Sequence, residues 1–369
     1  MFRKLFPIIV SLAAGFAGPV TAQELQSAAG PLRLERVVSG LDAPWGLGLL
    51  PGGGVLVSER GGRLLLVADG QARPVAGVPK VRAQGQGGLL DVTVARDFAQ
   101  SREVFLTFAK AQPGGAGGTA LAVGRLSASG DRLESVRILF EAADGGSGGR
   151  HFGSRVVEAP DGKLFVTIGD RGKRDLAQDL STHNGTVIRI NRDGSVPADN
   201  PFVGQSGARP EIWSYGHRNP QGAGLDGQGR LWISEHGARG GDEVNRIRKG
   251  ANYGWPVISY GRHYSGAKIG EGTAKPGMEQ PAHYWDPSIA PSGLMVYSGK
   301  LWPEWRGDIF VGALKFDHIA RLEGTPLREV EQISGPETER LRDIVEAPDG
   351  SIWFISVGQG AVYRMTPGG

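Results

Sequence analysis

The chain has 369 residues, of which 40% are hydrophobic and 21% charged, and its formal net charge is +3. Residues 1–22 carry two basic and no acidic side chains, so the rest of the chain holds 39 basic against 38 acidic residues. This balance gives no support to nucleic-acid or membrane-surface binding. The chain has no cysteine, which excludes disulfides, thiolate metal sites, iron–sulfur clusters and cysteine nucleophiles.

The N-terminus has the pattern of a secretory signal peptide. Arg3 and Lys4 precede an apolar run over 5–16, and residues 20–22 have the small-x-small form of a cleavage site. The apolar run is too short to span a bilayer, and no other run is longer. We therefore expect residues 1–22 to be cleaved and the mature protein to be periplasmic or secreted, without a membrane span.

The remaining chain shows a repeat of two apolar strands joined by a Pro, Asp or Gly turn. Copies lie at 47–57, 156–166, 224–233 and 344–355. Their separations fit units of roughly 45–60 residues, the size of a four-stranded propeller blade with insertions. The 60 glycines and 23 prolines are spread between apolar runs, which also favours short strands with tight turns. The sequence predicts an all-β fold, a six-bladed β-propeller with four-stranded antiparallel blades that forms one domain over 23–369.

The start of each blade and the closure of the ring can also be predicted. We expect pairing of residues 32–37 with the last blade, because this pairing removes exposed sheet edges. A β-sandwich or two small barrels are alternatives, but neither predicts the recurrence. The expected blades begin near Leu41, Leu89, His151, Trp213, Ser292 and Leu341.

Residues 211–256 alternate apolar runs with polar loops rich in glycine. Strands are expected at 212–215 and 231–234, and each runs into a polar cluster, at 216–221 and 235–243. If the two strands are adjacent, they bring a cation, amides, carboxylates and glycine carbonyls to one place. This pattern predicts a combined ion and anion site.

Further candidates lie in loops. Gln86 lies in a glycine-rich loop where a solvated side chain is the common alternative, and His151 either takes a proton near neutral pH or is merely solvated. The loop over 170–175 mixes charges and is interpreted as a surface or structural ion-pair loop. Arg218 and Asn219 in a turn suit a carboxylate ligand, although an arginine there can instead brace neighbouring loops.

Two further groups point to a cation and an anion. The carbonyls of Gly237 and Ala238 lie beside two acidic residues and are oxygen ligands that Ca²⁺ prefers, although the start of a helix has the same pattern. Arg340 and Arg342 flank Leu341 at strand alternation, and Lys315 follows another strand. Two like charges on one face repel each other, which favours an anionic ligand between them.

In their order along the chain, these residues resemble the pyrroloquinoline quinone (PQQ)-dependent soluble aldose sugar dehydrogenases, relatives of soluble glucose dehydrogenase. The resemblance runs from Leu41 to Ile344. Its most specific parts are Tyr215-Gly216-His217-Arg218-Asn219-Pro220-Gln221-Gly222, Glu235-His236-Gly237, Gly241-Asp242-Glu243 and Asn252-Tyr253-Gly254-Trp255-Pro256. These proteins are six-bladed propellers that bind PQQ and Ca²⁺ at one end of the central channel.

The resemblance implies an enzyme that oxidises aldose sugars at the anomeric carbon to lactones, with His151 as general base. Electrons pass from PQQ to an acceptor that the sequence does not identify. Ca²⁺ is expected at the carbonyls of Gly237 and Ala238, and a second, structural Ca²⁺ at the carbonyls of Glu243 and Tyr253. The residues that the resemblance assigns to PQQ are Gln86, Arg218, Asn219, Gln221, Lys315, Arg340 and Arg342, with Trp285 flanking the cofactor or the sugar.

Some positions depart from the family pattern. Arg150 stands where the glucose enzyme has an acidic residue, which leaves the preferred sugar open, and Ala238 replaces a more usual proline. Long insertions linked to dimer contacts are not evident, which favours a monomer. A calcium-dependent propeller lactonase or a non-catalytic binding propeller remain alternatives, although neither has a use for four convergent cations.

Overall fold

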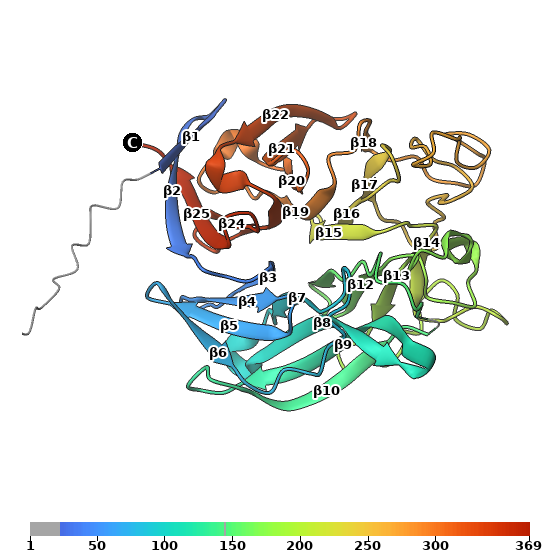
Figure 1. The fold of residues 1–369 in the computed structure, drawn as a ribbon, viewed down its shortest axis with the longest axis horizontal. Coiled ribbons are helices and arrows are strands. Elements are labelled where there is room, and N and C mark those ends of the chain that lie inside the picture. Colours follow the sequence, from blue (N-terminus) through green and yellow to red (C-terminus); the bar gives the residue numbers. More distant parts are fainter. Residues whose placement is uncertain (1–22, 144) are drawn as a thin grey trace, which may run out of the picture.

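The structure is a computed structural model that describes residues 23–143 and 145–369. Six antiparallel sheets are arranged in a ring around a central axis (Figure 1). The predicted six-bladed β-propeller is therefore confirmed. The predicted signal peptide, residues 1–22, lies outside the described residues. Within the described part of the chain, no helix has the length and apolar character needed to cross a membrane.

In each blade the strands follow one another outward from the axis. The first three blades contain β3 (Pro44–Leu49), β4 (Val55–Glu59), β5 (Arg63–Ala68) and β6 (Gln71–Val75); β7 (Leu89–Val94), β8 (Glu103–Gln112), β9 (Ala116–Leu126) and β10 (Leu133–Glu141); and β11 (Val156–Glu158), β12 (Leu164–Ile168), β13 (Thr186–Ile190) and β14 (Ile212–Tyr215).

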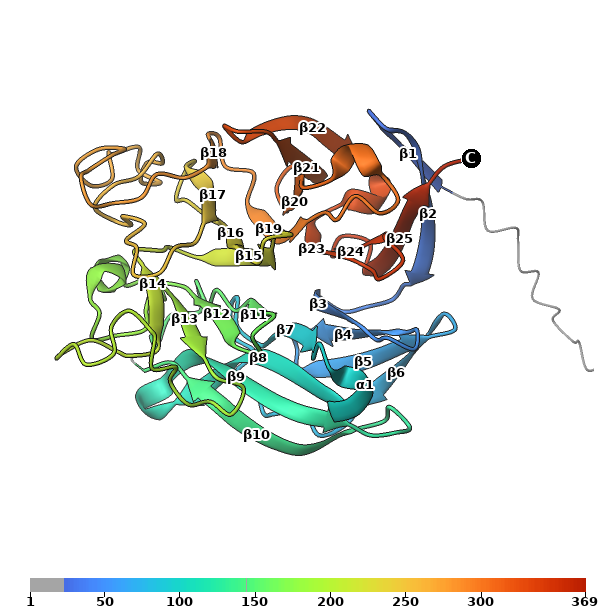
Figure 2. The same cartoon turned by 180° about the vertical axis from the view of Figure 1, so that it is seen from behind.

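The next two blades contain β15 (Pro220–Leu225), β16 (Leu231–Glu235), β17 (Asp242–Arg246) and β18 (His283–Trp285); and β19 (Pro291–Val296), β20 (Ile309–Ala313), β21 (His318–Glu323) and β22 (Arg328–Ser334). The sixth contains β23 (Leu341–Glu346), β24 (Ile352–Ser356), β25 (Ala361–Pro367), β2 (Gly30–Val38) and β1 (Gln23–Ser27). The short helix α1 (Phe98–Ser101) joins β7 to β8 and is visible from behind in Figure 2. Single helical turns occur at Pro113–Gly115, Arg174–Gln178, Pro303–Trp305 and Pro336–Thr338.

The two ends of the chain close the ring. Strand β2 pairs antiparallel with β25, with Leu32 opposite Pro367 and Leu34 opposite Met365. The predicted pairing of residues 32–37 with the last blade is confirmed. Strand β1 folds back on β2, so the sixth blade has five strands instead of the predicted four.

The predicted start of the fourth blade is wrong. Trp213 lies in β14, the outermost strand of the third blade, and the fourth blade begins at Pro220 in β15. Strands β14 and β16 therefore belong to different sheets, although their loops both lead toward the ring axis. The repeat at 224–233 includes the end of β15, but its first residues were assigned to the polar cluster at 216–221, because Pro and Gly are poor strand formers. Close packing requires Gly222, since a Cβ there would lie 2.2 Å from the carbonyl oxygen of Ser292.

Hydroxyl side chains connect neighbouring blades near the axis. From the second strand of its blade, Thr107 donates to the carbonyl of Ser154 at 2.6 Å, and Ser234 donates to the carbonyl of Ser292 at 2.8 Å. Thr167 makes the corresponding bond to Pro220 at 3.2 Å. These buried bonds satisfy carbonyls at the points where inner strands begin, so they fix where the loops that precede those strands lie.

A buried arginine lies where several blades meet. The Arg155 guanidinium pairs with Asp91 at 3.0 Å and with Asp343 at 2.8 Å, and it lies over the Trp45 ring. It also donates to the backbone carbonyl of Gln221 at 2.6 Å. All three charged side chains are at most 6% exposed. One residue of the third blade thus holds the first, second, fourth and sixth blades together.

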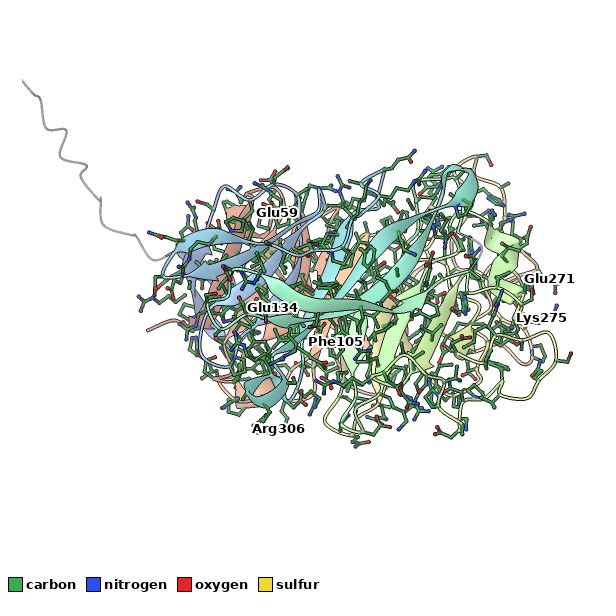
Figure 3. The ribbon with its side chains drawn as sticks, turned by 90° about the horizontal axis from the view of Figure 1, so that it is seen from below. Glu59, Phe105, Glu134, Glu271, Lys275 and Arg306 are labelled. Carbon is green, nitrogen blue, oxygen red and sulfur yellow. The ribbon has the colours of Figure 1, made fainter. Side chains whose placement is uncertain are left out.

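The connection over 247–282, between β17 and β18, is the long excursion at the edge of the ring in Figure 1. In the side view of Figure 3, its residues Glu271 and Lys275 lie at one margin of the molecule, where they form an ion pair at 2.8 Å. Part of this connection nevertheless returns toward the third blade, where the Trp255 indole donates to Asp170 at 2.9 Å.

We expect Arg155→Met to lower the free energy of unfolding by about 3–5 kcal/mol, because it leaves two buried carboxylates without their counter-ion. Urea unfolding would measure the change. The control is Arg364→Met, since Arg364 is 32% exposed and pairs with exposed carboxylates, so its loss should stay within about 1 kcal/mol. A similar small loss for both variants would contradict the importance of the buried pairing.

Candidate active site

A cavity of about 1050 Å³ lies at one end of the ring axis, and loops from all six blades line it. It is large for a single small-molecule site, since such pockets measure about 300–1,000 Å³. The lining residues include the predicted Gln86, His151, Arg218, Asn219, Gln221, Gly237, Ala238, Lys315, Arg340 and Arg342. Side chains separated by up to 256 positions in the sequence (86 to 342) thus border the same space.

His151 is held from two sides. Its backbone has a φ of 56°, and its N–H donates to Gln86 Oε1 at 2.7 Å. Its ring Nδ1 lies 2.7 Å from Asp170 Oδ1. Because a carboxylate can only accept, this bond places the proton on Nδ1 and leaves the lone pair of Nε2 as the acceptor.

Asp170 is a functional residue that the sequence interpretation missed. The loop over 170–175 was interpreted as a surface or structural ion-pair loop without a role in the site, but Asp170 is 1% exposed and contacts His151. Its second oxygen accepts from the Trp255 indole at 2.9 Å, and the backbone N–H of Gly172 donates to Oδ1. The signal was available: an aspartate lies two residues after the end of β12, and the loop before the neighbouring inner strand carries His151.

The electrostatic surroundings keep His151 neutral. Burial lowers the pKa of His151, the hydrogen bond from its ring to Asp170 partly offsets this effect, and the charge of Arg218 lowers the pKa further. Burial would raise the pKa of Asp170, but the bond with His151 and the bond from Gly172 bring it below the usual value. An ionised carboxylate therefore orients a neutral imidazole, the arrangement of a general base.

Four predicted cations border the cavity without carboxylate partners. In the described part of the chain, no Asp or Glu lies within ion-pair distance of Arg218, Lys315, Arg340 or Arg342. Burial lowers the pKa of Arg342 to about 9, and the charges of Arg155, Arg340 and Arg60 add to this effect. Uncompensated cations in a cavity wall favour an anionic ligand.

The cavity wall also carries uncharged acceptors. The Arg218 guanidinium donates to the carbonyls of His236 and Gly237. The Nε2 atom of His236 is buried and has no hydrogen-bond partner among the described residues. Burial and the charges of Arg218 and Arg342 lower the pKa of His236 to about 3, so this ring is neutral.

Asp242 shapes the segment that carries Gly237 and Ala238. One of its oxygens accepts from the Gly237 N–H at 2.8 Å, and the other accepts from the Ser288 hydroxyl and the Ala290 N–H. The carboxylate of Asp242 is therefore fully engaged. A cation at this segment would be bound through backbone carbonyls, as the sequence predicts, and not through Asp242.

Glu243 and Tyr253 border a separate hollow of about 10 Å³, enough for a single ion or water. Glu243 lies opposite Glu235 in the β16–β17 ladder, and Asn245 donates to both carboxylates at 3.0 Å. Burial and the neighbouring Glu235 raise the pKa of Glu243 to about 8. Two crowded carboxylates around an ion-sized hollow fit a cation.

Comparison with known proteins identifies the family and supports the fold. Residues 41–364 match the family model described as glucose/sorbosone dehydrogenase. The chain belongs to the glucose/sorbosone dehydrogenase family. It is 40% identical to the aldose sugar dehydrogenase YliI of Escherichia coli K12, with 98% of each chain covered. The resemblance inferred from sequence and the assignment to an oxidoreductase family are thereby confirmed.

Solved structures of family members share the fold. The apo-form of the soluble aldose sugar dehydrogenase from Escherichia coli superposes with a TM-score of 0.88 at 40% identity, covering 91% of this chain and 100% of that one. The PQQ-bound aldose sugar dehydrogenase of Streptomyces coelicolor superposes with a TM-score of 0.76 at 27% identity, covering 90% and 97%.

Trp285 does not line the cavity of this family member, in contrast to the expectation. It lies opposite Asp242 in the β17–β18 ladder, is 8% exposed, and its indole N–H donates to Glu329 of the fifth blade. The next residue, Asp286, lines the cavity instead. Trp285 is the last residue of β18 and its indole contacts the fifth blade, so the residue that follows the strand borders the cavity in its place.

We expect the pKa of His151 to lie below 6.5 in the free protein, with the proton of the neutral ring on Nδ1. Asp170→Asn should lower the pKa further, because the carboxylate raises it. NMR titration of ¹⁵N-labelled histidines would test both statements, with His151→Gln used to assign the resonance. A pKa at or above 6.5, or an increase in the Asp170→Asn variant, would show that the carboxylate does not control this ring.

Proposed function

We propose that the protein oxidises aldose sugars at the anomeric carbon to lactones, with PQQ and Ca²⁺ bound in the cavity. The observation that carries this proposal is the placement of an oriented neutral histidine and four unpaired cations around one space. The family membership supports sugar oxidation, and the Streptomyces coelicolor relative has been solved with PQQ bound.

The residues around the cavity fit PQQ, a flat ortho-quinone with three carboxylates. The opposite charge comes from Arg218, Lys315, Arg340 and Arg342. The buried Nε2 atom of His236 has no hydrogen-bond partner in the described part of the wall and is therefore available to a ligand. Gln86, Asn219 and Gln221 add amide groups. Trp285 is left out of this set because it lies behind the wall.

Ca²⁺ fits the carbonyls of Gly237 and Ala238. The Gly237 carbonyl now accepts from Arg218, so the guanidinium would move toward the anion when a cation binds. Neutral carbonyls among cations bind Ca²⁺ poorly by themselves, so the anionic cofactor would complete its ligands. Glu243 and Tyr253 would hold a second, structural Ca²⁺. When bound, PQQ supplies the hydride-accepting quinone, and Ca²⁺ makes it a stronger acceptor.

His151 would act at the substrate. Its Nε2 accepts the proton of the anomeric hydroxyl as the anomeric carbon is oxidised, and the charge of Asp170 stabilises the resulting imidazolium. The electrons then pass to an acceptor outside the chain. We place this activity outside the cytoplasm, because residues 1–22 have the pattern of a signal peptide. We also propose that the active protein is a monomer.

We expect the purified apo-protein to reduce an artificial dye with an aldose only when both PQQ and Ca²⁺ are added. The unpaired cations of the cavity wall need the anionic PQQ, and the backbone carbonyls need Ca²⁺, so neither addition alone should complete the site. Dye reduction would be followed with each addition alone and with both. Lactone cleavage without PQQ would instead support a calcium-dependent hydrolase, and the absence of both activities would support a binding protein.

We expect His151→Ala to lose about 10²–10⁴-fold in kcat while it still binds PQQ, because the histidine contributes proton transfer and not charge for the cofactor. Cofactor binding would be measured by absorbance titration. Added imidazole should restore part of the rate in His151→Ala. Near-normal turnover of the variant would refute the assignment of the base.

A further inference from the structure

The cavity contains more positive charge than the proposed cofactor uses. Besides the four cations assigned to PQQ, Arg60, Arg239 and Arg262 line the same space. Among the described lining residues, Asp286 is the single carboxylate. PQQ carries three carboxylates and Ca²⁺ adds two positive charges, so the filled cavity would still have a cationic excess. Such an excess favours a second anion.

Two of these additional cations form a pair. Arg239 and Arg262 lie directly opposite each other in a short antiparallel bridge, with N–H···O distances of 2.9 and 3.2 Å between their backbones. Opposite residues of an antiparallel pair project their side chains on the same side, and like charges in these positions repel. Neither guanidinium has an ion-pair or hydrogen-bond partner in the described part of the chain. An anion held between them would remove the repulsion.

The position of the pair separates it from the cofactor residues. Arg239 and Arg262 are exposed, whereas Arg218 is 8% exposed, so the pair belongs to the mouth of the cavity and not to its floor. Tyr264, two residues after Arg262, lines the same cavity as Arg218. The bridged segments therefore border the same cavity as the cofactor residues, at its mouth, where the outer end of a substrate would reach.

We propose that Arg239 and Arg262 bind a carboxylate or phosphate on the substrate, at the end of the aldose remote from the anomeric carbon. This inference rests on the proposed function and specifies its substrate class: aldoses with a terminal anion, such as uronic acids or aldose phosphates. The anion is assigned to the substrate and not to an acidic electron acceptor, because both arginines line the cavity that His151 borders. Planar guanidiniums pair with both kinds of oxyanion.

The test uses the enzyme reconstituted with PQQ and Ca²⁺ and an uncharged dye. It compares kcat/KM for glucuronate and for glucose 6-phosphate with that for glucose. We expect at least one of the two ratios to be about tenfold or more, and to fall toward one at about 0.5 M salt. Arg239→Gln and Arg262→Gln should each reduce the ratio by about tenfold. Arg73→Gln, an exposed arginine on β6, should leave the ratio unchanged. The carboxylate and phosphate arms distinguish the two anions.

A second measurement keeps this proposal separate from the oxidation itself. 1,5-Anhydroglucitol has no anomeric hydroxyl and cannot be oxidised there, so calorimetry can compare its binding with that of its 6-phosphate. Tighter binding of the phosphate that the two variants lose supports the arginine pair even if no aldose is oxidised. Oxidation of glucose with ratios near one and equal binding of the two analogues would overturn it. An effect of the variants that occurs only with an anionic acceptor would also overturn it and assign the pair to the acceptor.

Discussion

The buried contact of Arg155 with Asp91 and Asp343 is the constraint on which the rest of the structure depends. Six wedge-shaped sheets leave a polar axis, because their inner strands expose backbone groups there. A single guanidinium compensates two carboxylates from other blades and also donates to the backbone carbonyl of Arg342 at 3.1 Å. Removing one member of such a cluster leaves buried charge unpaired, which costs more than the cluster contributes. The ring thus fixes the floor of the cavity before any ligand is present.

That floor determines the electrostatics of the site. The charge of Arg155 contributes to the lowered pKa of Arg342, so the residue that holds the blades together also acts on a cation of the cavity wall. The His151 backbone lies in the left-handed region, and Gly169 has to be glycine because a Cβ there would lie 2.3 Å from the His151 carbonyl. Inner-strand geometry and loop geometry are therefore set together, and His151 lies where the blades place it.

The sequence contained enough to predict the architecture, because the repeat of strand, turn and strand reports a local requirement that recurs in each blade. It was also enough to predict which residues gather, since ordered motifs indicated one family. The sequence was not enough where the position of a residue depends on contacts with residues that are distant in the chain. Strand β15 violates strand propensity because Gly222 packs against the next blade, Asp170 is buried by contact with Trp255, and Trp285 contacts Glu329 of the fifth blade instead of the cavity. None of these contacts is local in sequence.

The base and the cations also influence each other. Arg218 lowers the pKa of His151, and the same arginine is proposed to bind a carboxylate of the cofactor. An anion beside Arg218 would offset its charge at the imidazole, so the ring would be a weaker proton acceptor in the empty cavity than in the filled one. The bond with Asp170 is independent of this change and keeps Nε2 as the acceptor in both states. The orientation of the His151 ring is thus a property of the fold, while its pKa depends on what the cavity contains.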